Sequence, residues 1–102
     1  MENDFGEPSV GREMPRYKSH KEVWALKIKA IAFDQALAAE QGRETDGSAT
    51  ITPEEPGYAP FKVDASYVRK HSPVVGGYYV VYDDGYTSYS PAAAFEAGYT
   101  RI

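Results

Sequence analysis

The chain has 102 residues, which is enough for one domain whose core buries roughly 60–70% of the unfolded surface. It contains no cysteine, which excludes a disulfide framework and a thiolate metal site. Its net charge of −4, from 15 acidic and 11 basic residues, argues against non-specific nucleic-acid binding. No apolar run approaches a membrane span, and the acidic, polar N-terminus is unlike a signal peptide, so we expect a cytoplasmic domain without membrane contact.

Residues 1–16 show no hydrophobic periodicity and are rich in glycine, proline and charge. Such a composition cannot bury enough apolar surface to offset the entropy of ordering. We therefore expect a disordered N-terminal tail, followed by a single α+β domain over residues 17–102.

A strict alternation of apolar and other side chains runs through residues 23–32. It is typical of a half-buried strand whose solvent face carries Lys27 and Lys29. One long helix over residues 20–41 is the alternative, because a capping-box pattern precedes this segment and alanine is abundant within it. The strand places both lysines in solvent while leaving fewer apolar side chains exposed than the long helix would.

We favour a strand that ends near Ile31, followed by a short helix over residues 35–41 that ends at Gly42. Residues 49–52 are rich in β-branched side chains and predict a second strand. Residues 58–63 predict a third short strand, in which a proline indicates an edge or a bulge.

Asp64 is a good N-cap for a helix over residues 65–71, whose last turn is basic and so suits the helix dipole. Residues 78–82 and 86–89 flank an Asp-Gly turn, which is a strong hairpin signal. Both faces of the first hairpin strand are apolar, which favours a central position in the sheet.

The end of the chain carries a second set of helix signals. Ser90 is expected to cap a helix that begins at Pro91, is anchored by Phe95, and ends at Gly98 in the left-handed conformation. The two consecutive glycines at residues 76–77 are expected to permit a β-bulge or a close approach of the backbone to another part of the chain.

These elements predict an α+β fold: a small antiparallel sheet of about four or five strands, barrel-like, with two short helices. The hairpin over residues 76–89 is expected at the centre of the sheet. We find no internal repeat and no low-complexity segment in the sequence.

No arrangement of residues predicts an enzyme, a cofactor site or a metal site. The acidic pairs at residues 54–55 and 83–84 lack the spacing of a calcium loop, and acids in turns are usually solvated turn formers. His20 and His71 are far apart and have no ligand-spaced partner. No nucleophile elbow or phosphate-binding loop is present.

The second half of the chain carries a recognisable set of motifs. They are Tyr67-Val68-Arg69-Lys70-His71, Gly76-Gly77-Tyr78-Tyr79-Val80-Val81-Tyr82, Asp84-Gly85-Tyr86, Ser90-Pro91 and Gly98-Tyr99-Thr100-Arg101-Ile102. This set resembles a group of small phage and prophage proteins that end in a similar block. In that group the first two strands are joined by a shorter turn, so residues 33–43 would be an insertion here. The resemblance implies a phage origin and transfers no catalytic residue.

The chain has nine tyrosines, and the simplest explanation is that several of them line a small β core. They also suit a protein-binding module, because tyrosine is enriched at interfaces. We expect an exposed cluster of tyrosines to contact a host protein, another phage protein or a second copy of the chain. The candidates are Tyr58, Tyr79, Tyr86 and Tyr89.

Nucleic-acid binding is the alternative function. A basic group with interleaved aromatic residues could follow a nucleic-acid backbone despite the acidic total charge. Its candidates are Arg16, Lys18, Lys21, Lys27 and Lys29.

Overall fold

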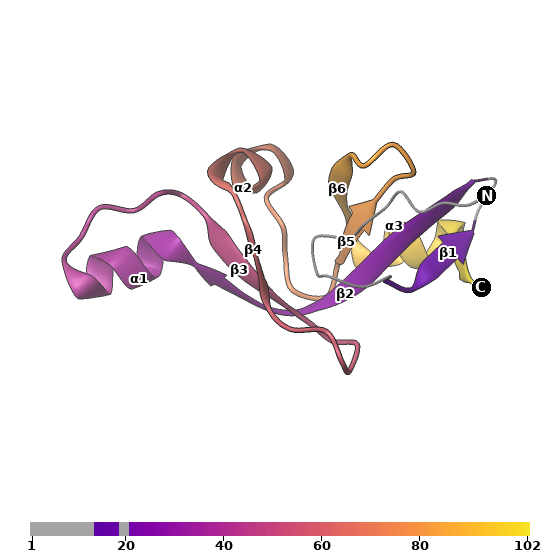
Figure 1. Ribbon diagram of the computed structural model, residues 1–102, viewed down its shortest axis with the longest axis horizontal. Helices are drawn as coiled ribbons and strands as arrows, with labels where there is room; N and C mark the ends of the chain where they lie inside the picture. The colour runs from indigo at the N-terminus through magenta and orange to yellow at the C-terminus, as the bar shows by residue number, and fades with distance from the viewer. Residues whose placement is uncertain (1–13, 19–20) are drawn as a thin grey trace.

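The computed structural model describes residues 14–18 and 21–102, and over these it has an α+β fold with seven strands and three helices (Figure 1). All recorded strand pairs are antiparallel, as expected. The elements are β1 (Arg16–Lys18), β2 (Glu22–Phe33), α1 (Asp34–Gln41), β3 (Ala49–Pro53), β4 (Phe61–Val63), α2 (Ala65–His71), β5 (Tyr78–Val81), β6 (Thr87–Ser90), α3 (Ala92–Gly98) and β7 (Thr100–Arg101). The overall expectation of four or five strands and two helices was too low, although each of the three helices matches a segment that was predicted to be helical.

The 12-residue strand β2 is the centre of the sheet, and the hairpin of β5 and β6 is not. Its first half pairs with β1 along one edge and with β5 along the other. Its second half pairs with β3, which in turn pairs with β4. The strand path runs β4-β3-β2-β1-β7 and does not close on itself, so the sheet is open and the barrel-like expectation was wrong.

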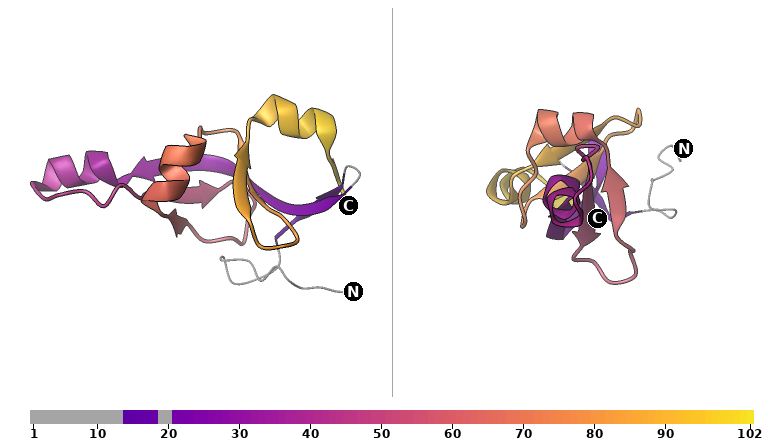
Figure 2. Two further views of the ribbon diagram at one scale, coloured as in Figure 1. Left: turned by 90° about the horizontal axis from the view of Figure 1, so that it is seen from above. Right: turned by 90° about the vertical axis from the view of Figure 1, so that its left-hand side faces the viewer.

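The molecule is elongated, with principal extents of 47 × 26 × 25 Å. Figure 2 shows α1 projecting from one end along the line of β2, while α3 lies over the other half of that strand. Helix α1 and the β2–β3 hairpin that carries it therefore form an arm beyond the thicker part of the molecule. We call residues 29–53 the arm.

The strand-then-helix interpretation of the long apolar segment is confirmed. Strand β2 continues two residues beyond Ile31, and α1 then ends at Gly42, which adopts the left-handed conformation with φ of 70°. Helix α2 is confirmed as well, with the side chain of Asp64 accepting the backbone N–H of Tyr67 at 3.0 Å.

Two hydrophobic clusters cover the two faces of β2. The first includes Trp24, Leu26 and Ile28 and receives Tyr67 from α2. The second includes Val23 and Ala25 and receives Phe95 from α3. Because alternate side chains of one strand enter opposite clusters, β2 holds the two cores together.

A β-bulge between Ile28 and Ala30 shifts the alternation of β2 by one residue. As a result Ile28 and Ile31 both pack on the first cluster, although they are three residues apart. The bulge keeps the same face of β2 buried where β3 takes over from β1 as the partner along that edge.

Met14 is 2% exposed and belongs to the first cluster, and the Pro15 carbonyl accepts the N–H of Ala25 at 2.9 Å. Strand β1 then pairs with β2 and β7. The expected tail was therefore too long, because residues 14–16 belong to the fold. The rest of that prediction lies outside the described residues.

The expected boundaries of α3 were displaced. Pro91 is the N-cap residue, without a side-chain cap bond from Ser90, and Gly98 lies inside the helix. The helix ends because Tyr99 is extended, with φ of −131°, and leads directly into β7. The predicted close approach at Gly77 is confirmed, since a Cβ atom there would lie 2.3 Å from the Tyr89 hydroxyl.

Candidate interaction surfaces

The four tyrosines predicted to contact a partner occupy different environments. Tyr79 is 4% exposed inside the first cluster, so it is wrong as a contact residue. Tyr58 and Tyr89 pack against the same cluster and are partly buried. Tyr86 is 44% exposed. Strand β5 has both faces covered, and this burial removes Tyr79 from the surface.

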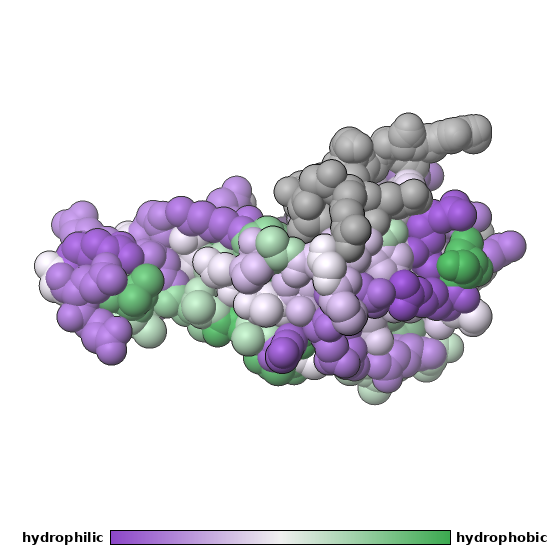
Figure 3. Space-filling model, turned by 60° about the horizontal axis from the view of Figure 1, so that its bottom comes forward, coloured by the Kyte–Doolittle hydropathy of each residue, from purple (hydrophilic) through white to green (hydrophobic). Residues whose placement is uncertain are grey.

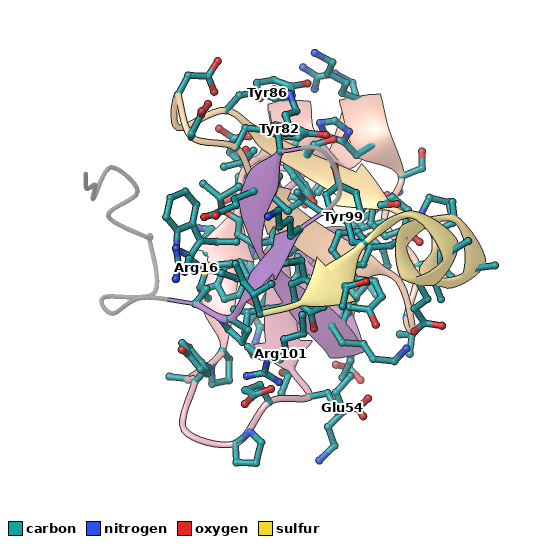
Figure 4. The ribbon with its side chains drawn as sticks, turned by 90° about the vertical axis from the view of Figure 1, so that its right-hand side faces the viewer. Arg16, Glu54, Tyr82, Tyr86, Tyr99 and Arg101 are labelled. Atoms are coloured by element: carbon teal, nitrogen blue, oxygen red, sulfur yellow. The ribbon has the colours of Figure 1, made fainter. Side chains whose placement is uncertain are left out.

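Tyr86 belongs to a different exposed group, which we call the tyrosine–lysine patch. The rings of Tyr82 and Tyr86 stack with centroids 5.8 Å apart and planes 10° apart (Figure 4). The Nζ atom of Lys21 lies 5.1 Å from the Tyr82 ring centroid, and that of Lys70 lies 5.1 Å from the Tyr86 centroid. His71 completes the patch, with its ring centroid 6.3 Å from Tyr86.

The hairpin turn positions the two stacked rings. The N–H of Tyr82 donates to the carbonyl of Tyr86 at 2.9 Å, and the N–H of Gly85 donates to the carbonyl of Tyr82 at 2.9 Å. Directly opposed side chains of a hairpin lie on the same face, so this register stacks the rings. Of the patch residues, Tyr86 and Lys21 were expected contact residues from the sequence, whereas Tyr82, Lys70 and His71 were not. The Asp-Gly turn was the signal that could have identified Tyr82.

Burial and the neighbouring Lys70 ammonium both lower the pKa of His71. The neutral form of this imidazole is therefore favoured beside the patch. The fixed positive charges of the patch come from Lys21 and Lys70, each placed over an electron-rich ring face.

The predicted lysine-bearing solvent face of β2 is largely covered. Ala25 is fully buried beneath α3, and Lys27 donates to Glu96 of that helix at 2.9 Å. Tyr78 also donates to Glu96, at 2.7 Å. These two bonds hold the pKa of Glu96 below its usual value, while burial and the bond to Glu96 raise the pKa of Tyr78.

The other basic candidates do not form one row. Arg16 is paired with Glu22 at 3.0 Å, and Lys21 belongs to the tyrosine–lysine patch. Lys18 and Lys29 are exposed at separate places on the sheet. The continuous basic face expected for the nucleic-acid alternative is therefore not assembled by these residues.

A pocket of about 190 Å³ lies beside Lys27, between Tyr17, Tyr78 and the acidic residues Glu54 and Glu55. Glu55 accepts two hydrogen bonds from Arg101, at 3.2 and 3.3 Å. Figure 4 shows Arg101 on the opposite side of the sheet end from Tyr82 and Tyr86. The volume is below the ~300 Å³ at which small-molecule sites usually begin. Two of its charged groups, Lys27 and Glu55, already pair with Glu96 and Arg101.

One member of each acidic pair makes a structural bond, since Glu55 accepts from Arg101 and Asp84 accepts within the hairpin turn. Asp84 accepts the N–H of Tyr86 within the hairpin turn, at 2.9 Å. Over residues 14–18 and 21–102, no group of three or more His, Asp or Glu side chains is placed to hold a metal ion. No helix in that part of the chain is long and apolar enough to span a membrane. His20 lies outside the described residues.

Exposed apolar side chains gather toward the arm. Phe33 and Leu37 are 41% and 45% exposed, and Val74 and Val75 in the segment before β5 are 60% and 56% exposed. Figure 3 shows hydrophobic surface beside α1 at one end of the molecule. Away from the arm, Ile102 is 54% exposed and Tyr86 is 44% exposed.

The fold and its surfaces define an α+β domain whose exposed features suit contact with another macromolecule. No protein-family model and no curated protein matches the chain. Among solved structures, the chain is similar to the monomeric form of the phage L decoration protein, determined in solution by NMR. The two share 34% sequence identity with a TM-score of 0.60, over 92% of this chain and 63% of that protein. The chain thus spans somewhat less than two thirds of the decoration protein's length.

Proposed function

We propose that this chain is a non-enzymatic phage accessory protein that binds the protein shell of a phage capsid. The observation that carries the proposal is the similarity to the phage L decoration protein, at 34% identity over 92% of the chain. Identity at this level over nearly the whole chain supports a related role as well as a related fold. The phage-like block at the end of the sequence points to the same origin.

The surfaces of the molecule support binding to a protein. The tyrosine–lysine patch offers two stacked tyrosine rings with a lysine over each, and tyrosine is enriched among the residues that dominate binding energy at protein interfaces. The arm adds exposed apolar side chains on an elongated shape. Both features expose aromatic or apolar area that a partner protein could bury.

Co-sedimentation with capsids tests the proposal. Capsids of the phage that encodes the chain, assembled without it, are mixed with the labelled protein and pelleted. We expect saturable binding that an excess of unlabelled protein displaces. Failure to bind these capsids at micromolar protein concentrations would overturn the proposal.

Single-stranded nucleic acid is the second candidate partner. The specific observation is the pair of stacked tyrosines, each with a lysine above it, because base stacking beside cations is a common way to bind single strands. A gel shift at low salt with single- and double-stranded DNA and RNA tests it. Absence of any complex removes this alternative, and a complex that a Tyr86→Ala variant loses would favour it.

A further inference from the structure

The second half of β2 is paired along only one edge. From Trp24 to Lys27, β5 pairs with the edge of β2 that lies opposite β1. At Ile28 this edge is bonded to the segment before β5, through the Gly76 N–H and the Gly77 carbonyl. From Lys29 to Phe33, β3 pairs with one edge, and no described strand pairs with the other. Figure 1 shows this half of the strand running out toward α1, beyond β5.

The register identifies which backbone groups point to the open edge. The N–H of Asp34 donates to the Ser48 carbonyl at 2.9 Å, so the backbone groups of Asp34 point toward β3. Ala32 and Ala30, which pair with Thr50 and Thr52, point the same way. Backbone groups of successive residues in a strand point to opposite edges. The N–H and C=O groups of Ile31 and Phe33 therefore point away from β3, toward the open edge.

The side chains along this edge lack the usual protection against strand pairing. Ala30, Ala32 and Phe33 are exposed, and Lys29 is the one charged side chain within β2 beyond Ile28. Exposed edges are normally protected by charge, proline or very short length. An apolar five-residue edge is a template for another strand.

Two other strand edges in the described part of the chain, those of β4 and β6, are protected. Strand β4 has three residues, with Lys62 at its centre and Pro60 just before it. On β6, the hydroxyl of Tyr67 donates to the Ser88 carbonyl at 2.7 Å, so α2 covers that edge. The contrast makes the open edge of β2 a specific feature of this fold.

Two exposed valines lie where the open edge begins. Val74 and Val75 immediately precede Gly76, whose N–H donates to the Ile28 carbonyl at 2.9 Å. A strand added beside Ile31 and Phe33 would therefore run toward these valines and could bury them. Apolar side chains at alternate positions of that strand would meet this surface.

We propose that residues 29–33 bind an extended segment of the capsid coat protein by β-strand addition. Unpaired backbone donors and acceptors specify an extended backbone as the occupant, and the row of apolar side chains specifies apolar residues at alternate positions. Lys29 favours an acidic residue at the matching end of the segment. The inference rests on the proposed capsid-binding function and names the surface that performs it.

Two pairs of variants test the inference in the capsid co-sedimentation assay. Phe33→Lys places a charge on the open edge, and Leu37→Lys places the same charge at a similarly exposed position on α1. Ile31→Pro removes a backbone N–H that points to the open edge of β2. Lys62→Pro is its control, because the N–H of Lys62 points away from β3, to the protected edge of β4. The unfolding midpoint of each variant confirms that it is folded.

We expect Phe33→Lys and Ile31→Pro to weaken capsid binding by about tenfold or more, since they remove strand pairing. Leu37→Lys and Lys62→Pro should bind within about twofold of wild type. Hydrogen exchange adds a direct measurement, because the amides of Ile31 and Phe33 should become protected only in the capsid complex.

Different failures have different meanings. If the wild-type protein does not bind capsids, the proposed function fails and the inference falls with it. If wild type binds and the two open-edge variants bind equally well, only the inference is overturned. If those variants lose self-association while capsid binding persists, the edge pairs with a second copy, and the coat-protein assignment is wrong.

Discussion

At Gly77 the packing of a neighbouring side chain requires glycine, although the backbone φ is not in the left-handed region. A Cβ atom there would lie 2.3 Å from the hydroxyl of Tyr89 and 2.5 Å from its ring. The same hydroxyl donates to the Val74 carbonyl at 3.4 Å. The side chain of Tyr89 therefore lies directly against the backbone at the start of β5.

We predict that Gly77→Ala lowers the free energy of unfolding by about 1–2 kcal/mol, because the Tyr89 ring must move and lose its packing. Gly98→Ala is the matched control, since its Cβ would meet nothing within 4 Å and the residue lies in α3. Alanine should stabilise that helix by about 0.5–1 kcal/mol. Urea unfolding measures both, and equal effects of the two substitutions would contradict the assignment.

At the scale of elements, a single carboxylate joins the start of α1 to the loop that follows it. Asp34 accepts bonds from the Arg43 guanidinium at 2.8 and 3.2 Å, from the Thr45 hydroxyl at 2.8 Å and from the Asp46 N–H at 3.2 Å. The side chain of Asp34 is 15% exposed. These contacts, Arg43 first among them, hold the pKa of Asp34 well below its ordinary value of 3.8.

A carboxylate whose pKa is lowered by folding stabilises the fold above its unfolded-state pKa. That contribution is lost as the pH falls through the folded-state pKa. We therefore predict that Asp34→Asn destabilises the protein at pH 7 and that the difference from wild type shrinks as the pH falls below 3.8. Urea titrations from pH 7 to pH 2 measure it, with Arg43→Ala expected to follow the same trend. A difference that stays constant over this range would sink the idea.

Elements with local chemical signals were predictable, and elements made by distant pairing were not. The capping carboxylate of α2 and the glycine after α1 act within a few residues, so their helices were placed correctly. Strands β1 and β7 have three and two residues, too short for any periodicity. They exist because β7 pairs with β1, and β1 pairs in turn with β2. Their pairing also extends Tyr99 and so ends α3.

The same distinction explains the candidate surfaces. Alternation in β2 predicted the strand but not that α3 would cover its lysine-bearing face, because Glu96 lies 69 residues from Lys27. Tyr86 was placed correctly at the surface, since it flanks a turn. Tyr79 was placed wrongly, although the two apolar faces of its strand already indicated burial; one cluster covers each of these faces.

At the scale of the whole molecule, β2 connects two cores that otherwise come from different parts of the chain. The first cluster is closed by α2 and the second by α3. Since β2 cannot leave one cluster without disturbing the other, the two should unfold together. Trp24, the single tryptophan, lies in the first cluster, whereas Phe95 lies in the second.

We predict that Phe95→Leu lowers the urea midpoint reported by Trp24 fluorescence, although the two side chains lie in different clusters. The loss should be about 1–2 kcal/mol, because Phe95 is 1% exposed and its ring stacks on Tyr78 with centroids 4.2 Å apart. Val75→Ala is the control, since that side chain is 56% exposed and should change stability by no more than about 0.5 kcal/mol. NMR signals of α3 should disappear at the same urea concentration as the Trp24 signal changes. Two separate transitions would mean that the clusters on the two faces of β2 unfold independently, and that the Phe95 cluster can be lost while the Trp24 cluster remains.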